Sequence, residues 1–106
     1  MSAKVFCAMD TPDLAATLDL VQKLSPLDLH LKLGLEFFTA EGIAGVEKIR
    51  AVIKPQTEIF LDLKFHDIPN TVKGAVTSAL RAQPQFLTIH ASGGPAMIEA
   101  AANAAK

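Results

Sequence analysis

The chain has 106 residues, of which 10 are Lys or Arg and 11 are Asp or Glu, so its formal net charge is −1. This balance does not favour an electrostatic partnership with nucleic acid or with an anionic membrane surface. Half of the residues are hydrophobic, enough for one domain with a core, and no apolar run approaches the ~20 residues of a membrane span. The lone Cys7 excludes an internal disulfide, and no signal peptide is visible, so we expect a cytoplasmic protein.

The first strand–helix unit is predicted over residues 5–24. Its strand is the apolar stretch 5–9, which ends before Asp10. Thr11 and Pro12 then predict the start of a helix, because a hydroxyl residue is a preferred N-cap and proline fits the first helical position. Leucine or valine at positions 14, 18 and 21 follows at helical spacing, so the helix should extend to about residue 24.

Three further strand–helix units follow with the same rhythm. Strands are predicted over residues 29–33, 58–63 and 86–89, and the third strand should leave the sheet near Lys64. Apolar residues at helical spacing indicate helices over about 43–53 and 70–80, and an alanine-rich helix should follow Pro95. Strands and helices that alternate at this spacing are typical of a parallel sheet with right-handed crossover connections.

Charged and polar residues gather where these strands end, at Asp10, Lys32, Asp62, Lys64 and His90. A flavodoxin-like open sheet would also fit the alternation. A (β/α)₈ barrel, however, is the fold that keeps its catalytic groups at the carboxyl ends of its strands. A complete barrel needs ~200 residues or more. The sequence therefore predicts one α/β domain over residues 1–106, a parallel (β/α)₄ half of a TIM (β/α)₈ barrel.

Lys64 lies within the most unusual charge pattern of the sequence. Asp62 and Lys64 are two residues apart in a strand, so their side chains point to the same face, and Asp67 follows three residues later. If the strands lie side by side, Lys32, Asp62, Lys64 and Asp67 can form a chain of alternating charges. Such alternation lowers the cost of burying each charge, and it should keep Lys64 protonated, which suits a proton donor.

Residues 61–72, with the pattern Asp-x-Lys-x-x-Asp-Ile-Pro-x-Thr, resemble the orotidine 5′-monophosphate decarboxylase family. The resemblance extends from residues 6–10 through 32–34 to 90–94, and it covers about the first half of such an enzyme. It implies a carbon–carbon lyase that converts orotidine 5′-monophosphate into UMP and CO₂, the last step of de novo pyrimidine nucleotide biosynthesis. It also implies that no metal or cofactor is needed.

The resemblance implies a catalytic role for four residues. Lys64 would be the proton donor, and Asp62 would lie against the departing carboxylate. Asp67 and Lys32 would complete the charged surroundings, with Lys32 also contacting the substrate. The serine, glutamine and phosphate-binding arginine of the family would come from its second half, which this chain lacks.

Further contacts follow from the same resemblance. Asp10 would contact the ribose hydroxyls, and His90 would form a wall of the same site. Asp67, Ile68 and Thr71 would reach into the site of a neighbouring subunit, which makes the active unit a homodimer. A half barrel alone exposes two unpaired strand edges, so we expect this chain to self-associate and to be inactive by itself.

Several alternatives stay open at this stage. His30 and His66 are expected to be ordinary surface or hydrogen-bonded residues, and Ser92-Gly93-Gly94 to form a tight turn rather than a phosphate site. A related Mg²⁺-dependent sugar-phosphate lyase is disfavoured, because those relatives place a glutamate where this chain has Lys32, and Mg²⁺ prefers carboxylate oxygens. The remaining alternative is a truncated or engineered half barrel that folds and associates without catalysis.

Overall fold

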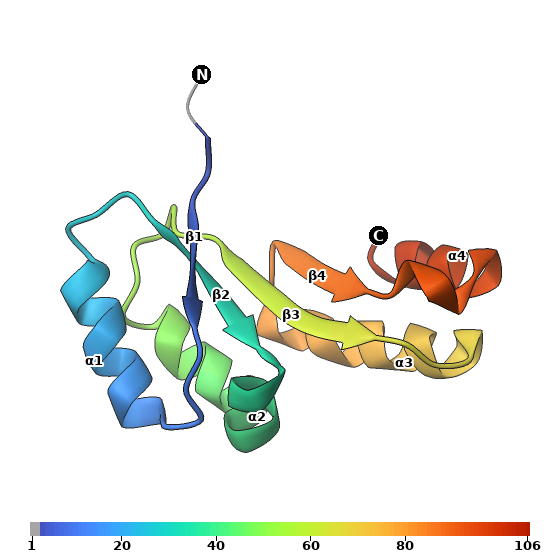
Figure 1. The fold of residues 1–106 in the computed structure, drawn as a ribbon, viewed down its shortest axis with the longest axis horizontal. Coiled ribbons are helices and arrows are strands. Elements are labelled where there is room, and N and C mark those ends of the chain that lie inside the picture. Colours follow the sequence, from blue (N-terminus) through green and yellow to red (C-terminus); the bar gives the residue numbers. More distant parts are fainter. Residues whose placement is uncertain (1–2) are drawn as a thin grey trace.

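The computed structural model describes residues 3–106, which form four strands that alternate with four α-helices (Figure 1). The strands are β1 (Phe6–Met9), β2 (His30–Gly34), β3 (Ile59–Phe65) and β4 (Phe86–Ile89). The helices are α1 (Leu14–Leu24), α2 (Leu35–Arg50), α3 (Pro69–Ala79) and α4 (Pro95–Ala104), with short 3₁₀ turns at η1 (Leu80–Ala82) and η2 (Ala91–Gly93). All neighbouring strands are parallel, in the order β1-β2-β3-β4, which confirms the predicted (β/α)₄ arrangement.

One face of the sheet packs against the helices. Alternate residues of the strands point to this face, and α1 and α2 cover it with their apolar sides. A second, smaller core joins α3 to α4, with Val72 and Val76 packed near Met97. The buried strand residues of the first core, each at most 3% exposed, are Met9, Leu31, Leu33, Ile59, Leu61 and Leu63.

The opposite face of the sheet carries aromatic rings toward the amino ends of the strands. The ring centroids of Phe6 and Phe86 are 5.6 Å apart, although these residues lie on the two outer strands. The ring centroid of Phe60 lies 5.8 Å from that of Phe6 and 6.0 Å from that of Phe86. The sheet is therefore strongly curled, as a barrel wall is. Within residues 3–106, none of these three rings belongs to either apolar core.

The predicted start of the first helix is wrong. Helix α1 begins at Leu14, and its N-cap is Asp13, whose carboxylate accepts a hydrogen bond from the Ala15 N–H at 3.1 Å. The Thr11 hydroxyl instead accepts a hydrogen bond from the Asp13 N–H at 3.1 Å. Because Thr11 is used in this turn, it cannot cap the helix, and Pro12 lies outside the helix.

The predicted bounds of the second helix, 43–53, are wrong at both ends. Helix α2 begins at Leu35 and ends at Arg50. It is kinked at Gly42, where φ is 64° and ψ is −161°, a conformation that is essentially restricted to glycine. The helical periodicity is interrupted at the kink. The apolar pattern that starts at Ile43 therefore belongs only to the segment of α2 after Gly42.

Candidate active site

The site forms around an irregular stretch of β3. The strand was predicted to end at residue 63, but it continues to Phe65, which pairs with Ile89 of β4. The register between the two strands shifts between Leu61 and Phe65, and Lys64 has a φ of 52°, which is uncommon for a residue other than glycine. Bulges of this kind re-aim a side chain, and strained backbone clusters at functional sites.

Charged side chains gather around Asp62. Its Oδ2 atom accepts hydrogen bonds from the Lys64 Nζ at 2.7 Å and from the Lys32 Nζ at 3.1 Å. The Asp62 side chain is 11% exposed, compared with 30% for Lys32 and 56% for Lys64. A nearly buried carboxylate therefore lies between two ammonium groups, and the ammonium of Lys64 is the more accessible of the two.

These contacts lower the pKa of Asp62 from its usual 3.8 to about 2. The largest cause is the hydrogen bond from Lys64, and those from Thr88 and Lys32 add to it, whereas burial acts in the opposite direction. Asp62 is therefore ionised at neutral pH. Two ammonium groups and one carboxylate leave one net positive charge, which suits an anionic substrate.

Asp67, the expected fourth member of the charge chain, does not join this group within residues 3–106. Its Oδ1 atom accepts a hydrogen bond from the Ile68 N–H at 2.7 Å, in the loop before α3. Asp67, Ile68 and Thr71 are all exposed, and Ile68 is 65% exposed despite its apolar side chain. The alternation predicted inside one chain therefore ends at Lys64.

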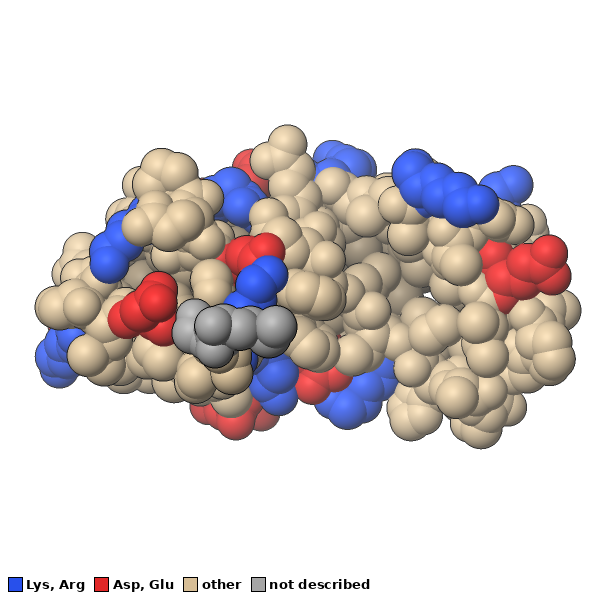
Figure 2. Space-filling view, turned by 90° about the horizontal axis from the view of Figure 1, so that it is seen from above, with Lys and Arg blue, Asp and Glu red and all other residues tan. Residues whose placement is uncertain are grey.

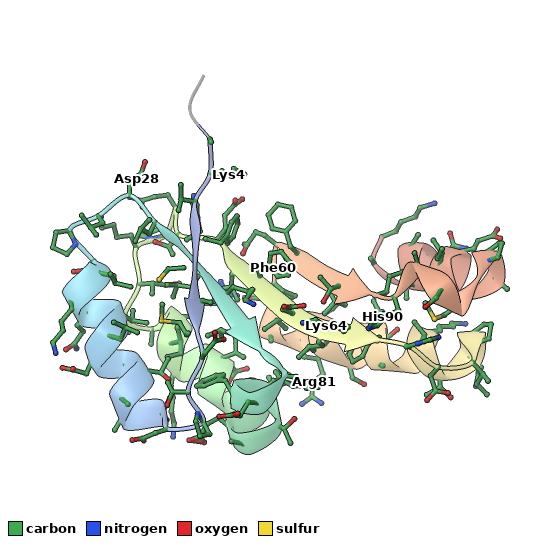
Figure 3. The ribbon with its side chains drawn as sticks, in the orientation of Figure 1. Lys4, Asp28, Phe60, Lys64, Arg81 and His90 are labelled. Carbon is green, nitrogen blue, oxygen red and sulfur yellow. The ribbon has the colours of Figure 1, made fainter. Side chains whose placement is uncertain are left out.

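Asp10 and His90 follow β1 and β4, as predicted, but neither side chain is hydrogen-bonded to the charged group in the described part of the chain. Asp10 is exposed, and its Oδ1 lies 3.9 Å from where a Cβ would stand at Gly34. His90 is exposed and stacks on His66, with ring centroids 5.3 Å apart. Figure 3 places His90 close to Lys64, with Phe60 toward the other end of β3.

Two expected ordinary features are confirmed. The Nδ1 atom of His30 accepts a hydrogen bond from the Glu58 N–H at 2.9 Å, and its ring lies 5.1 Å from that of Phe6. Residues 91–93 form a 3₁₀ turn, and Gly94 has a φ of 92°, which permits the sharp entry into α4. The glycine pair is therefore used as a tight turn.

Thr88 is the residue of this site that the sequence reasoning missed. Its hydroxyl donates a hydrogen bond to Asp62 Oδ1 at 2.8 Å and accepts one from the Lys64 backbone N–H at 3.0 Å. Threonine is common in strands, so its identity carried no signal. Strand alternation did carry one, because Thr88 lies two residues from both Phe86 and His90 and so shares their face.

No group of three or more His, Cys, Asp or Glu side chains that could hold a metal ion lies together in residues 3–106. Over the same residues, no helix is long and apolar enough to cross a membrane.

Comparison with known proteins gives relatives at high identity but partial length. A decarboxylase from Moorella thermoacetica, named orotidine 5′-phosphate decarboxylase, is 50% identical over 103 residues, which are 97% of this chain and 40% of that protein. The enzyme of the same name from Novosphingobium aromaticivorans is 50% identical over 105 residues, 99% of this chain and 46% of that protein. The chain thus spans less than half the length of these curated relatives.

Solved structures agree with the fold. Orotidine 5′-phosphate decarboxylase from Lactobacillus acidophilus has a TM-score of 0.85 at 35% identity, and the match covers 97% of this chain and 45% of that one. The Methanocaldococcus jannaschii decarboxylase, complexed with the inhibitor BMP, has a TM-score of 0.90 over 99% of this chain and 48% of that one. At 21% identity the latter supports the fold alone.

The four strand–helix units therefore correspond to half of the decarboxylase TIM barrel. The profile described as "Orotidine 5'-phosphate decarboxylase / HUMPS family" matches residues 3–106. The chain belongs to the orotidine 5′-phosphate decarboxylase / HUMPS family.

Proposed function

We propose that residues 1–106 are one folded unit, the N-terminal half of an orotidine 5′-monophosphate decarboxylase, and that this half supplies the proton donor. The observation that carries the proposal is the Asp62 carboxylate, which is hydrogen-bonded to both Lys64 and Lys32 at the carboxyl end of the sheet. This is the edge at which TIM-barrel enzymes keep their catalytic groups. The relatives at 50% identity carry the name of this enzyme.

In the proposed reaction, the bond between the pyrimidine ring and its carboxylate breaks, and CO₂ leaves. The electron pair of that bond stays on the ring carbon, which then takes a proton from the Lys64 ammonium. The Asp62 carboxylate destabilises the bound substrate, because it repels the substrate carboxylate, while the two ammonium groups stabilise the carbanion that forms. After the transfer, neutral Lys64 keeps its hydrogen bond to Asp62.

Further substrate contacts come from three residues around this group. The exposed Asp10 carboxylate can accept hydrogen bonds from ribose hydroxyls, and Lys32 and His90 border the same strand ends. The chain carries 10 basic and 11 acidic residues, and both kinds occur on the face that Figure 2 shows; this balance favours a small nucleotide substrate over a nucleic acid or a membrane surface.

We further propose that Asp67, Ile68 and Thr71 complete the site of a second subunit in a homodimer. All three side chains are exposed, and a carboxylate from a partner would lie favourably beside the ammonium groups of Lys32 and Lys64, which share the single carboxylate of Asp62. An exposed Ile68 is also what an interface would bury.

A Mg²⁺-dependent lyase of the same family is disfavoured, because Lys32 lies where such an enzyme needs a carboxylate and is already hydrogen-bonded to Asp62. A cytoplasmic location is supported by the free Cys7, and cell fractionation with a periplasmic or extracellular result would contradict it.

The test uses a complete barrel in which residues 1–106 are followed by the second half of a curated relative. Lys64→Ala and Asp67→Ala should each lower kcat/KM by ~10²-fold or more, because each removes part of the proton-transfer group. Lys48→Ala, which changes an exposed lysine of α2, is the matched control and should stay near the unmodified level.

Mixing the two inactive variants then tests the subunit boundary. Random exchange makes half of the dimers hybrids, each with one intact site of two, so activity should return to about a quarter of the unmodified level. If Lys64→Ala retains a tenth of the activity, the role of Lys64 is wrong. If mixed subunits exchange but no activity returns, the role of Asp67 across the boundary is wrong.

A further inference from the structure

We propose that Thr88 is a positioning residue of this site, whose hydroxyl holds the backbone of Lys64 and the carboxylate of Asp62 in one fixed arrangement. The structural part of this inference stands on the hydrogen bonds alone. Its consequence for catalysis rests on the proposed function.

The Thr88 hydroxyl links β4 to β3 through two hydrogen bonds, one as donor and one as acceptor. Its single proton goes to Asp62 Oδ1 at 2.8 Å, and its oxygen accepts the Lys64 N–H at 3.0 Å. Both partners lie where the ladder is interrupted, between the pairs Leu61–Leu87 and Phe65–Ile89. A side chain therefore satisfies the backbone group that the bulge leaves without a ladder partner.

The hydrogen bond to Lys64 matters because the backbone of this residue is in a costly conformation. A φ of 52° persists in a residue with a Cβ only when surrounding contacts hold it. This conformation sets the direction in which the Lys64 side chain leaves the strand. Loss of the Thr88 hydroxyl would remove a contact that fixes this direction.

Because of the hydrogen bond from Thr88, the two carboxylate oxygens of Asp62 have different partners. Oδ1 is held by Thr88, and Oδ2 accepts from both Lys64 and Lys32. The terminal side-chain torsion of an aspartate has a broad range of allowed angles. Without the hydrogen bond from Thr88, the carboxylate could therefore rotate, and the two lysines could bind to different oxygens. Thr88 thus brings both ammonium groups to one oxygen.

Three variants of the 106-residue chain test the structural part. Thr88→Val keeps the branched shape and removes the hydroxyl, and Thr88→Ser keeps the hydroxyl. Thr77→Val is the matched control, because within residues 3–106 the Thr77 hydroxyl bonds only to the Lys73 carbonyl, on the exposed side of α3. The readouts are amide hydrogen exchange at Lys64 and the pKa of the Asp62 carboxyl from NMR titration.

Thr88→Val should speed exchange at Lys64 by about tenfold or more, because the amide loses its acceptor. It should also raise the pKa of Asp62 toward its usual value, since one hydrogen bond to the charged form is gone. Thr88→Ser and Thr77→Val should match the unmodified chain. Unchanged exchange and pKa in Thr88→Val would overturn the proposal. If Thr88→Val does not fold, a folded Thr88→Ser chain that loses both properties would overturn it equally.

The kinetic part uses the complete barrel described above. Thr88→Val should lower kcat by about 10–100-fold through misplacement of the donor, and KM should change much less. Thr88→Ser should restore most of kcat. An equal loss in both variants would contradict a positioning role for the hydroxyl. If the unmodified barrel is inactive, the proposed function fails, while the exchange and titration results still decide the role of Thr88.

Discussion

The carboxylate of Asp62 is nearly buried and yet ionised, and its neighbours explain why. Removing a charge from water is costly unless opposite charges and hydrogen bonds replace the lost solvent. Asp62 receives three such hydrogen bonds, from Lys64, Lys32 and Thr88. The lysines keep part of their own solvation, because their side chains are 56% and 30% exposed. This division lets one carboxylate hold two ammonium groups at modest cost.

The pKa of Asp62 predicts how stability depends on pH. The folded-state pKa is lowered to about 2 from 3.8, so the stabilisation is complete above about pH 4 and is lost as the pH falls through about 2. Asp62→Asn removes this contribution and leaves two lysines close together. It should lower the free energy of unfolding by about 1–2 kcal/mol at neutral pH, a value that allows for the partial exposure of the lysines. The difference from the unmodified chain should shrink as the pH falls from 4 to 2.

Urea unfolding between pH 2 and pH 7 measures this difference. Asp19→Asn is the control, because the Asp19–Lys23 pair is exposed at 63% and 71% and should contribute little at any pH. A difference that stays constant, or that grows toward low pH, would show that Asp62 is not held in its ionised form.

Part of the site could be predicted from the sequence, for a definite physical reason. Asp62 and Lys64 share a face by strand alternation, and Lys32 lies near the end of the neighbouring strand, where Gly34 pairs with Asp62, so parallel pairing brings the three charged side chains together. The positive φ of Lys64 and the two hydrogen bonds of Thr88 could not be predicted. They depend on the register of β3 against β4, which no local pattern reports.

The same contrast holds for whole elements. Strand β4 and the start of α3 agree with their predicted positions within one residue, because turn residues and proline mark their ends. Helix α2 differs, since Gly42 divides it into two segments with different periodicity. The elements whose ends are marked by turn residues or proline at these positions were therefore predicted well, whereas the single glycine in an unusual conformation made the prediction of α2 wrong.

The outer strands predict how the isolated chain behaves in solution. Within residues 3–106, β1 and β4 each have one unpaired edge, and Phe86 on β4 is 44% exposed. Beside it, Leu87, Ile89 and Ile98 help to line a groove of about 270 Å³. Unpaired edges next to apolar surface recruit other chains, so we expect the 106-residue chain to self-associate.

Phe86→Lys should weaken this association by about tenfold or more, because a charge on an edge strand opposes strand pairing. Val52→Lys is the matched control, since Val52 is 43% exposed but lies in the turn after α2 rather than on an outer strand. Sedimentation velocity over a range of concentrations measures the effect. An unmodified chain that stays monomeric, or equal behaviour of the two variants, would contradict it.

At the scale of the whole molecule, the face of the sheet opposite α1 and α2 carries different side chains at its two ends. Aromatic rings fill the amino end, and the charged group with Thr88 occupies the carboxyl end. In TIM barrels, phosphate is often bound by the loops after strands seven and eight, which four units do not include. Without that remote binding energy, the charged group alone should give no useful rate.

Under the proposed function, this chain supplies the proton-donating half of a decarboxylase barrel. The most direct test is to assay decarboxylation of orotidine 5′-monophosphate by the 106-residue chain, by the second half of a curated relative, and by the two mixed together. We expect no turnover from either half alone, clear turnover from the mixture, and none from a mixture made with Lys64→Ala. A soluble complex of the two halves that is inactive, or one that stays active with Lys64→Ala, would contradict the claim.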